Sequence, residues 1–120
     1  MSIGINIGSG DPKRLVDYYT KLFGAPLFEG AGYASWQVAD GLVTVGPHDE
    51  VEGRNTQPGR VMWNILTLDA KSDFERYKAA GAIVVRDLYQ DADAPEFWIA
   101  TFSDPDDNYF QIVSRVEPTS

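Results

Sequence analysis

The sequence contains no cysteine, and this absence removes several kinds of chemistry. Disulfide bonds, thiolate nucleophiles and cysteine-based metal or iron–sulfur sites are all excluded. Basic residues are also scarce, because 10 Lys and Arg stand against 18 Asp and Glu and leave a net charge of −8. Since affinity for nucleic acids depends largely on basic side chains that neutralise phosphates, we expect no nucleic-acid partner.

The chain also lacks a long apolar segment. No apolar run approaches the roughly 20 residues that a transmembrane helix requires, and residues 1–11 have neither the basic start nor the apolar stretch of a signal peptide. No Asn is followed two residues later by Ser or Thr, so the acceptor for N-glycosylation is missing as well. We therefore expect a cytoplasmic protein without membrane contacts.

The residues that are present suffice for one compact domain spanning residues 1–120. Hydrophobic residues make up 43% of the chain, which is enough for a real core. The length of 120 residues is too short for a barrel or a dinucleotide-binding fold of ordinary size. Intrinsic disorder is excluded by the same composition.

The first part of the chain predicts a strand, a helix and three further strands. Isoleucines alternate with small or polar residues over residues 3–7, which is typical of a strand. Asp11 followed by Pro12 predicts a helix that the Asp11 carboxylate caps, and Gly24 ends this helix. Short strands then follow at residues 27–28, 33–38 and 42–46.

The second part of the chain repeats this order of elements. A capping box of Ser72 and Glu75 predicts the start of a second helix, which Gly81 ends. Strands are predicted at residues 61–68, 82–85, 97–102 and 109–113. Both helices end in a similar Lys-x-x-Gly-Ala sequence, and the two glycines are 57 residues apart, so we expect a duplicated unit. The expected βαβββ modules span about residues 1–46 and 60–116, with residues 47–59 as a linker.

Several segments give the chain a resemblance to a known superfamily. They are Asp11-Pro12, Tyr18-Tyr19, Phe23-Gly24, Gly46-Pro47-His48 and, most specifically, the segment TFSDPDDNYFQ at residues 101–111. Together they resemble the vicinal oxygen chelate superfamily, which includes glyoxalase I, extradiol dioxygenases and bleomycin-resistance proteins. The resemblance implies an α+β fold in which two tandem βαβββ modules form a half-open mixed β-barrel, and it implies a homodimer.

The resemblance also identifies the positions at which members of the superfamily bind a metal. Such members typically carry His at the opening of each module's first strand and Glu in the last strand. The matching positions here are Gly4, Met62 and Gln111, with a fourth near Thr44. One neutral amide oxygen does not hold a catalytic divalent ion, so we expect neither a metal nor another cofactor. A metal held by His48 with carboxylates from elsewhere is the alternative.

The same positions predict which side chains face the cleft. Because side chains alternate along a strand, Asn6, Asn64 and Tyr109 would share the concave face with the vacated ligand positions. The two Asn carboxamides would then contact whatever fills the cleft, or alternatively they bond to each other or to the backbone. The face of residues 34–38 that carries Trp36 is also assigned to the pocket, whereas Trp63 is assigned to the core. The expected ligand-contacting residues are Asn6, Trp36, Met62, Asn64, Tyr109 and Gln111.

His48 is the only histidine and the first candidate for a catalytic residue. Histidine is the commonest general acid or base in enzymes, and a Pro-His-Asp-Glu turn places His48 at the expected rim of the cleft. The alternative is a surface histidine that Asp49 or Glu50 orders.

These observations favour a protein that binds a small organic molecule in a concave cleft without the usual metal. Two enzymatic alternatives stay open: a metal-dependent glyoxalase or dioxygenase, and a metal-free lyase or isomerase that uses His48. We also expect a homodimer, since the edges of a half-open barrel need cover.

Overall fold

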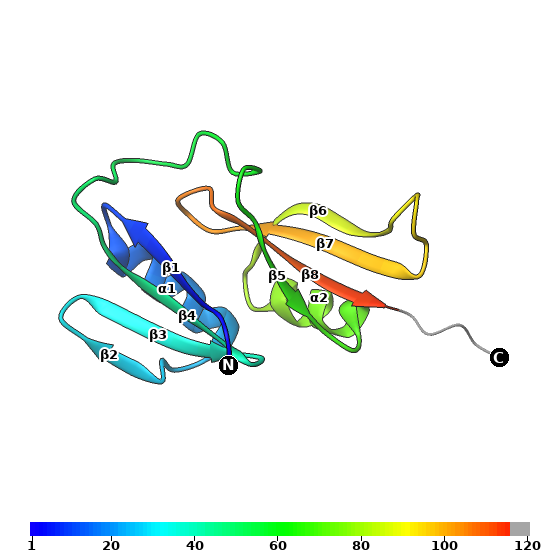
Figure 1. The fold of residues 1–120 in the computed structure, drawn as a ribbon, viewed down its shortest axis with the longest axis horizontal. Helices are drawn as coiled ribbons and strands as arrows, with labels where there is room; N and C mark the ends of the chain where they lie inside the picture. The colour runs from blue at the N-terminus through cyan, green and yellow to red at the C-terminus, as the bar shows by residue number, and fades with distance from the viewer. Residues whose placement is uncertain (116–120) are drawn as a thin grey trace.

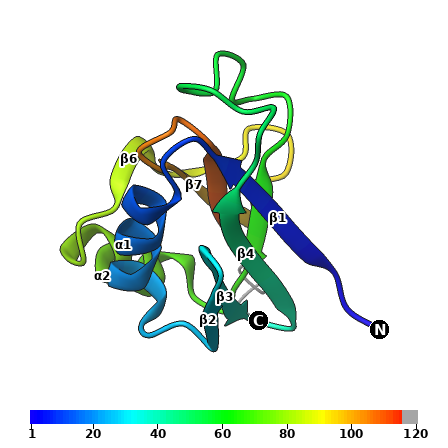
Figure 2. The ribbon, with the colours of Figure 1, turned by 90° about the vertical axis from the view of Figure 1, so that its left-hand side faces the viewer.

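The computed structural model describes residues 1–115, so Val116, the expected end of the second module, lies outside the described residues. Eight strands form two four-stranded mixed sheets, and one helix packs against each sheet (Figure 1). Figure 2 shows both helices on the same side of β1 and β4. The elements are β1 (Gly4–Ser9), α1 (Pro12–Phe23), β2 (Phe28–Gly30), β3 (Tyr33–Val38), β4 (Gly41–Pro47), β5 (Trp63–Leu66), α2 (Ala70–Ala79), β6 (Ile83–Gln90), β7 (Phe97–Ser103) and β8 (Tyr109–Arg115).

The two sheets have the same topology. The strand order is β1-β4-β3-β2 in the first sheet and β5-β8-β7-β6 in the second. β1 pairs with β4 in parallel, and β5 pairs with β8 in parallel, whereas the remaining strand pairs are antiparallel. The predicted α+β fold with two βαβββ units is confirmed. Within residues 1–115 the sheets do not close into a complete barrel, in agreement with the expected half-open arrangement.

One aromatic cluster joins the two sheets into a single core. Tyr19 and Phe23 project from α1, and their rings contact Trp63 of β5 and Phe110 of β8. The rings of Trp63 and Phe110 stack with their centroids 4.9 Å apart. Because the helix of the first module buries its aromatic residues against the second module, the two modules share one core.

The turn between β7 and β8 anchors α1 through buried polar groups. Asp104 is fully buried and accepts a hydrogen bond of 2.7 Å from the Tyr19 hydroxyl. Asp106 accepts a hydrogen bond of 2.6 Å from Ser9 and forms an ion pair with Arg14. The most specific segment of the resemblance therefore holds the two modules together in this protein.

The groups that cap the two helix starts differ from the predicted ones, although the first helix begins at Pro12 as predicted. In the described structure the Asp11 side chain makes no capping hydrogen bond, and the Ser9 hydroxyl instead accepts one from the Asp11 N–H at 3.0 Å. The second helix begins at Ala70, because Asp69 caps it by accepting a hydrogen bond of 3.1 Å from the Ser72 N–H. Ser72 thus lies inside the helix, and the earlier start buries Ala70 in the core.

Two strands also have different lengths from the predicted ones. β5 is shorter, since it pairs with β8 only over residues 63–66, and Met62 precedes it. β6 is longer, because it continues to pair with β7 through two irregularities in register. Within residues 1–115, neither helix has the length and apolar character needed to cross a lipid bilayer.

Candidate functional site

The face of each sheet opposite its helix, called here the outer face, carries a row of polar side chains. In the first sheet, Asn6 pairs with Thr44, and Thr44 pairs with Ser35. The hydroxyl groups of Ser35 and Thr44 are hydrogen-bonded at 2.8 Å. The Asn6 side chain is exposed, whereas Ile7 on the opposite face is buried, as strand alternation requires.

The second sheet repeats this row. Asn64 pairs with Gln111, and Gln111 pairs with Thr101. The Gln111 amide nitrogen donates a hydrogen bond of 2.9 Å to the Thr101 hydroxyl. Asn6 and Asn64 thus occupy equivalent positions in the two modules, as do Thr44 and Gln111.

A cavity of about 260 Å³ opens on the outer face of the first sheet. We call it the His48 pocket. Its lining includes Asn6, Gly8, Tyr33, Thr44, Gly46 and His48. The structure therefore brings together Asn6, His48 and Thr44, which lies near the expected fourth metal position, and it adds Tyr33, which the predicted site did not contain.

Two glycines shape this pocket. A Cβ atom on Gly46 would lie 2.1 Å from the Tyr33 ring, and one on Gly8 would lie 2.8 Å from the His48 Cβ. Both distances are far shorter than real carbon–carbon contacts, so only glycine lets the two side chains lie against the strands at these positions. An aromatic residue that covers a strand glycine is a known packing arrangement, and Gly46 was the signal by which Tyr33 could have been found.

The hydrogen bonding of His48 determines what its ring presents to the pocket. The Nδ1 atom accepts a hydrogen bond of 3.1 Å from the Glu50 N–H, so the proton of the neutral ring lies on Nε2. The side chain is 54% exposed, and Nδ1 lies 3.7 Å from the Asp49 carboxylate. Neutral His48 therefore offers a hydrogen-bond donor at Nε2.

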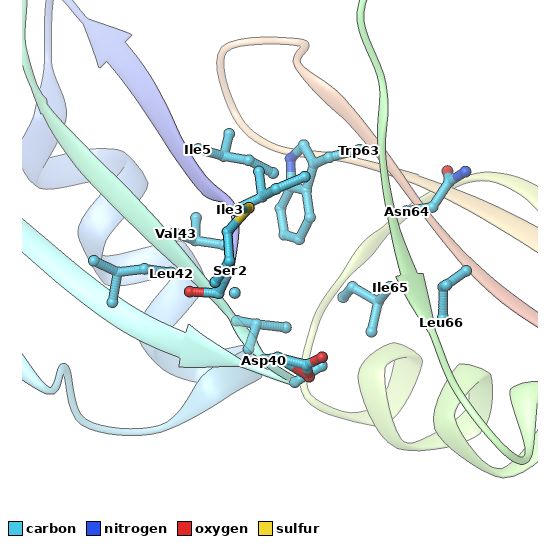
Figure 3. A pocket seen from close by; sticks show the side chains of 14 residues that line it. Ser2, Ile3, Ile5, Asp40, Leu42, Val43, Trp63, Asn64, Ile65 and Leu66 are labelled. Carbon is cyan, nitrogen blue, oxygen red and sulfur yellow. The ribbon is translucent and has the colours of Figure 1, made fainter.

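Asn64 lies at a different cavity. This second cavity, of about 640 Å³, lies between β5 and the strands β1 and β4, and we call it the seam cavity. Figure 3 shows the Asn64 carboxamide directed away from β1, at the edge of the cavity. The lining of the seam cavity does not include Asn6, and that of the His48 pocket does not include Asn64.

The assignment of Trp36 to the pocket was wrong. Trp36 is only 2% exposed, its indole nitrogen donates a hydrogen bond of 2.9 Å to the Gly24 carbonyl, and its ring contacts Tyr19. Its neighbour in the register is the buried Val43, so this face of β3 packs beneath α1. Trp63, which was assigned to the core, both stacks on Phe110 and borders the seam cavity.

The remaining predicted contact residues lie on the second module. Met62 is 39% exposed and precedes β5. Tyr109 and Gln111 are half-buried on β8, two positions apart and therefore on one face of the strand. Neither belongs to the lining of the His48 pocket.

The donor set at the superfamily's metal positions does not fit a divalent metal ion. Gly4 offers no side chain, and Met62 offers only a thioether. The Gln111 amide and the Thr44 hydroxyl are neutral and already hydrogen-bonded to neighbouring side chains. Within residues 1–115 no three His, Asp or Glu residues lie close enough to hold a metal together.

Raised pKa values are found away from the His48 pocket, where α1 meets the second module. Burial raises the pKa of Asp104, although hydrogen bonds from Asn108 and Tyr19 oppose the shift. Burial also raises the pKa of Tyr18 to about 12 and that of Tyr19 well above its usual value. Because these groups are hydrogen-bonded within the core, we assign them a structural role.

Known structures resemble this chain over nearly its whole length. A glyoxalase/bleomycin resistance protein from Catenulispora acidiphila DSM 44928 is 20% identical with a TM-score of 0.69, and 95% of this chain and 96% of that chain are covered. A glyoxalase-related enzyme from Fulvimarina pelagi is 20% identical with a TM-score of 0.72, covering 94% and 86%. A glyoxalase/bleomycin resistance protein/dioxygenase from Alicyclobacillus acidocaldarius is 14% identical with a TM-score of 0.73, covering 98% and 91%. At these identities the likeness shows the fold alone.

The resemblance to the vicinal oxygen chelate superfamily is supported by a family model as well as by the fold. The model of the glyoxalase-like domain matches residues 4–113, and the chain belongs to this family. No curated protein matches the sequence.

Proposed function

We propose that the protein binds a small organic molecule in the His48 pocket. The observation that carries this proposal is the convergence of Asn6, Tyr33, Thr44 and His48 on one cavity of about 260 Å³. The pocket combines an aromatic ring with a carboxamide, a hydroxyl and an imidazole, and few polar groups around an apolar surface are typical of ligand sites.

The lining indicates the kind of ligand. The volume lies just below the roughly 300 Å³ at which sites for drug-sized molecules begin, so a molecule with a single ring is the appropriate size. Its ring would pack on Tyr33, and its polar group would bond to the Asn6 carboxamide and to the Nε2–H of His48. A neutral aromatic amide such as benzamide meets these requirements and serves as a probe.

Benzamide titration of three variants tests the proposal. We expect Asn6→Ala and His48→Ala each to weaken binding about fivefold, as the loss of one hydrogen bond requires, and His48→Gln to retain most of the affinity because it keeps a donor. Gln37→Ala, an exposed residue of β3 outside the pocket, is the matched control and should bind like the unaltered protein. The measurement is the dissociation constant from chemical-shift changes. Equal affinities for all variants would contradict the proposal.

An enzymatic role for His48 is the second candidate, and the exposed imidazole at the pocket supports it. A lyase or isomerase would need the ring to accept a proton, yet the Nδ1 lone pair is engaged by the Glu50 N–H and Nε2 carries the proton of the neutral ring. This geometry favours binding. If the unaltered protein incorporated deuterium from the solvent into hydroxyacetone and His48→Gln did not, the enzymatic role would be supported.

We also infer that the protein forms a homodimer. The support is the number of large apolar side chains exposed on the single chain outside the two cavities, among them Phe28, Val61, Leu68, Ile83 and Val85. In addition, β2 and β6 are edge strands whose outward backbone groups pair with no strand among the described residues. Both features are typical of surfaces that a second subunit covers.

A further inference from the structure

The seam cavity differs in chemistry from the His48 pocket. Apart from the backbone, it is lined mainly by aliphatic side chains and the indole of Trp63, and Asp40 is its one ionisable side chain within residues 1–115. The two linings share no residue in this part of the chain. With a volume of about 640 Å³, the seam cavity has the size of a small-molecule site and is too small for a helix or a folded partner.

The walls of the cavity come from both modules. Figure 3 shows Ile3 and Ile5 of the first module opposite Trp63 and Ile65 of the second. Ile3 is 78% exposed, so the cavity presents apolar surface to solvent in the single chain. Covering this surface with an apolar ligand would be favourable, because apolar surface would be removed from water.

Trp63 adds one specific requirement. Its indole nitrogen is buried and has no hydrogen-bond acceptor among the described residues. In Figure 3 the indole extends from β5 toward β1, with its nitrogen on the side of Ile5. A buried donor without an acceptor is costly, so a ligand that brought an acceptor between Ile5 and Trp63 would gain a hydrogen bond that the protein does not supply.

Charge narrows the ligand class further. Asp40 borders the cavity and the chain carries a net charge of −8, so a carboxylate or phosphate would be repelled. We infer that the seam cavity is a second binding site, which takes an uncharged, largely apolar molecule with one carbonyl acceptor. An aromatic ketone is such a molecule.

Two probes of nearly equal shape isolate the role of the acceptor. We expect 2-acetylnaphthalene to bind the full chain about fivefold more tightly than 2-ethylnaphthalene, since the two differ mainly in the carbonyl oxygen. The anion 2-naphthoate should bind more weakly than either probe. Dissociation constants from isothermal titration give these ratios. An equal or higher affinity for 2-naphthoate would overturn the assignment of charge.

Three variants locate the site. Trp63→Phe should abolish the preference for the acetyl probe while it retains binding of the ethyl probe. Ile3→Trp should fill the cavity and lower the affinity for both probes at least tenfold, whereas Leu27→Trp, at a position equally exposed but outside the cavity, should not. Ile3 is exposed, so this substitution does not threaten folding. Unchanged binding in Ile3→Trp, or an acetyl preference that survives Trp63→Phe, would overturn the inference.

A last variant separates the two sites. Asn6→Ala should leave the naphthalene probes unaffected, because Asn6 lines only the His48 pocket. Loss of benzamide binding in Asn6→Ala together with intact binding of 2-acetylnaphthalene supports two independent sites. If Asn6→Ala weakened both ligands equally, the two cavities would act as one and the inference would fail.

Discussion

At the scale of single residues, Tyr18 has a hydroxyl that bonds twice to the second module. It donates a hydrogen bond of 2.7 Å to the Ser103 carbonyl and accepts one of 3.0 Å from the Ile83 N–H. The side chain is buried, and burial raises the pKa of Tyr18 to about 12. The folded protein therefore holds this proton more tightly than the unfolded chain, in which a Tyr hydroxyl titrates near pH 10.

The raised pKa predicts alkaline destabilisation. The contribution of Tyr18 to stability is complete below about pH 10 and is lost as the pH rises toward 12. We expect Tyr18→Phe to lower the free energy of unfolding by about 2 kcal/mol at neutral pH, since two buried groups lose their partner, and to flatten the decline between pH 10 and 12. Urea denaturation at several pH values measures both effects. A decline equally steep in Tyr18→Phe would show that other groups cause it.

Residue patterns predicted part of the site and missed part of it. Strand alternation placed Asn6 on the face opposite the helix, where it is found. The same rule did not settle which face of β3 is covered, because Trp36 and Tyr33 give both faces of this strand an aromatic residue. Only the long-range packing of α1 decides that Trp36 is buried.

At the scale of elements, the N-cap residue of α1 and the side chain that bonds to the backbone at the helix start are two different residues. The N-cap residue is Asp11, but the side chain that satisfies a free backbone N–H belongs to Ser9, at the end of β1. The Ser9 hydroxyl in turn donates a hydrogen bond of 2.6 Å to the Asp106 carboxylate. One small buried side chain thus connects β1, α1 and the turn before β8.

This arrangement reverses the usual ranking of two substitutions at a helix start. We expect Ser9→Ala to cost about 2 kcal/mol, because it removes an acceptor for Asp11 N–H and a donor to the buried Asp106. Asp11→Ala should cost less than about 0.5 kcal/mol, since its carboxylate is exposed and makes no capping bond in the described structure. Midpoints of chemical denaturation give both values. If Asp11→Ala cost more stability than Ser9→Ala, the Asp11 side chain would be the capping group after all.

The ends of a helix were predicted correctly where one residue type alone determines the backbone conformation. The first helix begins at Pro12 and ends before Gly24 as predicted, because proline and glycine act on the backbone itself. The second helix was predicted to start at the capping box of Ser72 and Glu75, but Asp69 caps it and it starts at Ala70. The burial of Ala70 favours the earlier start, and this burial depends on the tertiary structure.

At the scale of the whole molecule, the exposed apolar surface predicts association. We expect sedimentation equilibrium to give a mass of twice 13.3 kDa at micromolar concentrations. Leu68→Lys, which charges a fully exposed leucine, should weaken the dimer at least tenfold if this end of β5 lies in the interface. A mass of 13.3 kDa for the unaltered protein up to millimolar concentration would contradict the proposed homodimer.

The duplication was readable from the sequence, whereas the contact between the modules was not. Two glycines 57 residues apart indicated a repeated helix end, and the repeated sheet order follows. The contacts of the Tyr19 and Phe23 rings of α1 with Trp63 and Phe110 join residues far apart in the chain. Local periodicity carries no information about such pairs.

The turn of Asp104 and Asp106 has a consequence for how relatives are recognised. Both carboxylates bond to residues of the first module, namely Tyr19, Ser9 and Arg14, so this most recognisable stretch of the sequence serves to join the two modules. We expect a homologue that keeps this stretch to share the scaffold, whatever it binds. The ligand of such a protein is therefore better inferred from the positions equivalent to Asn6, Thr44 and His48, which line the pocket and do not join the modules.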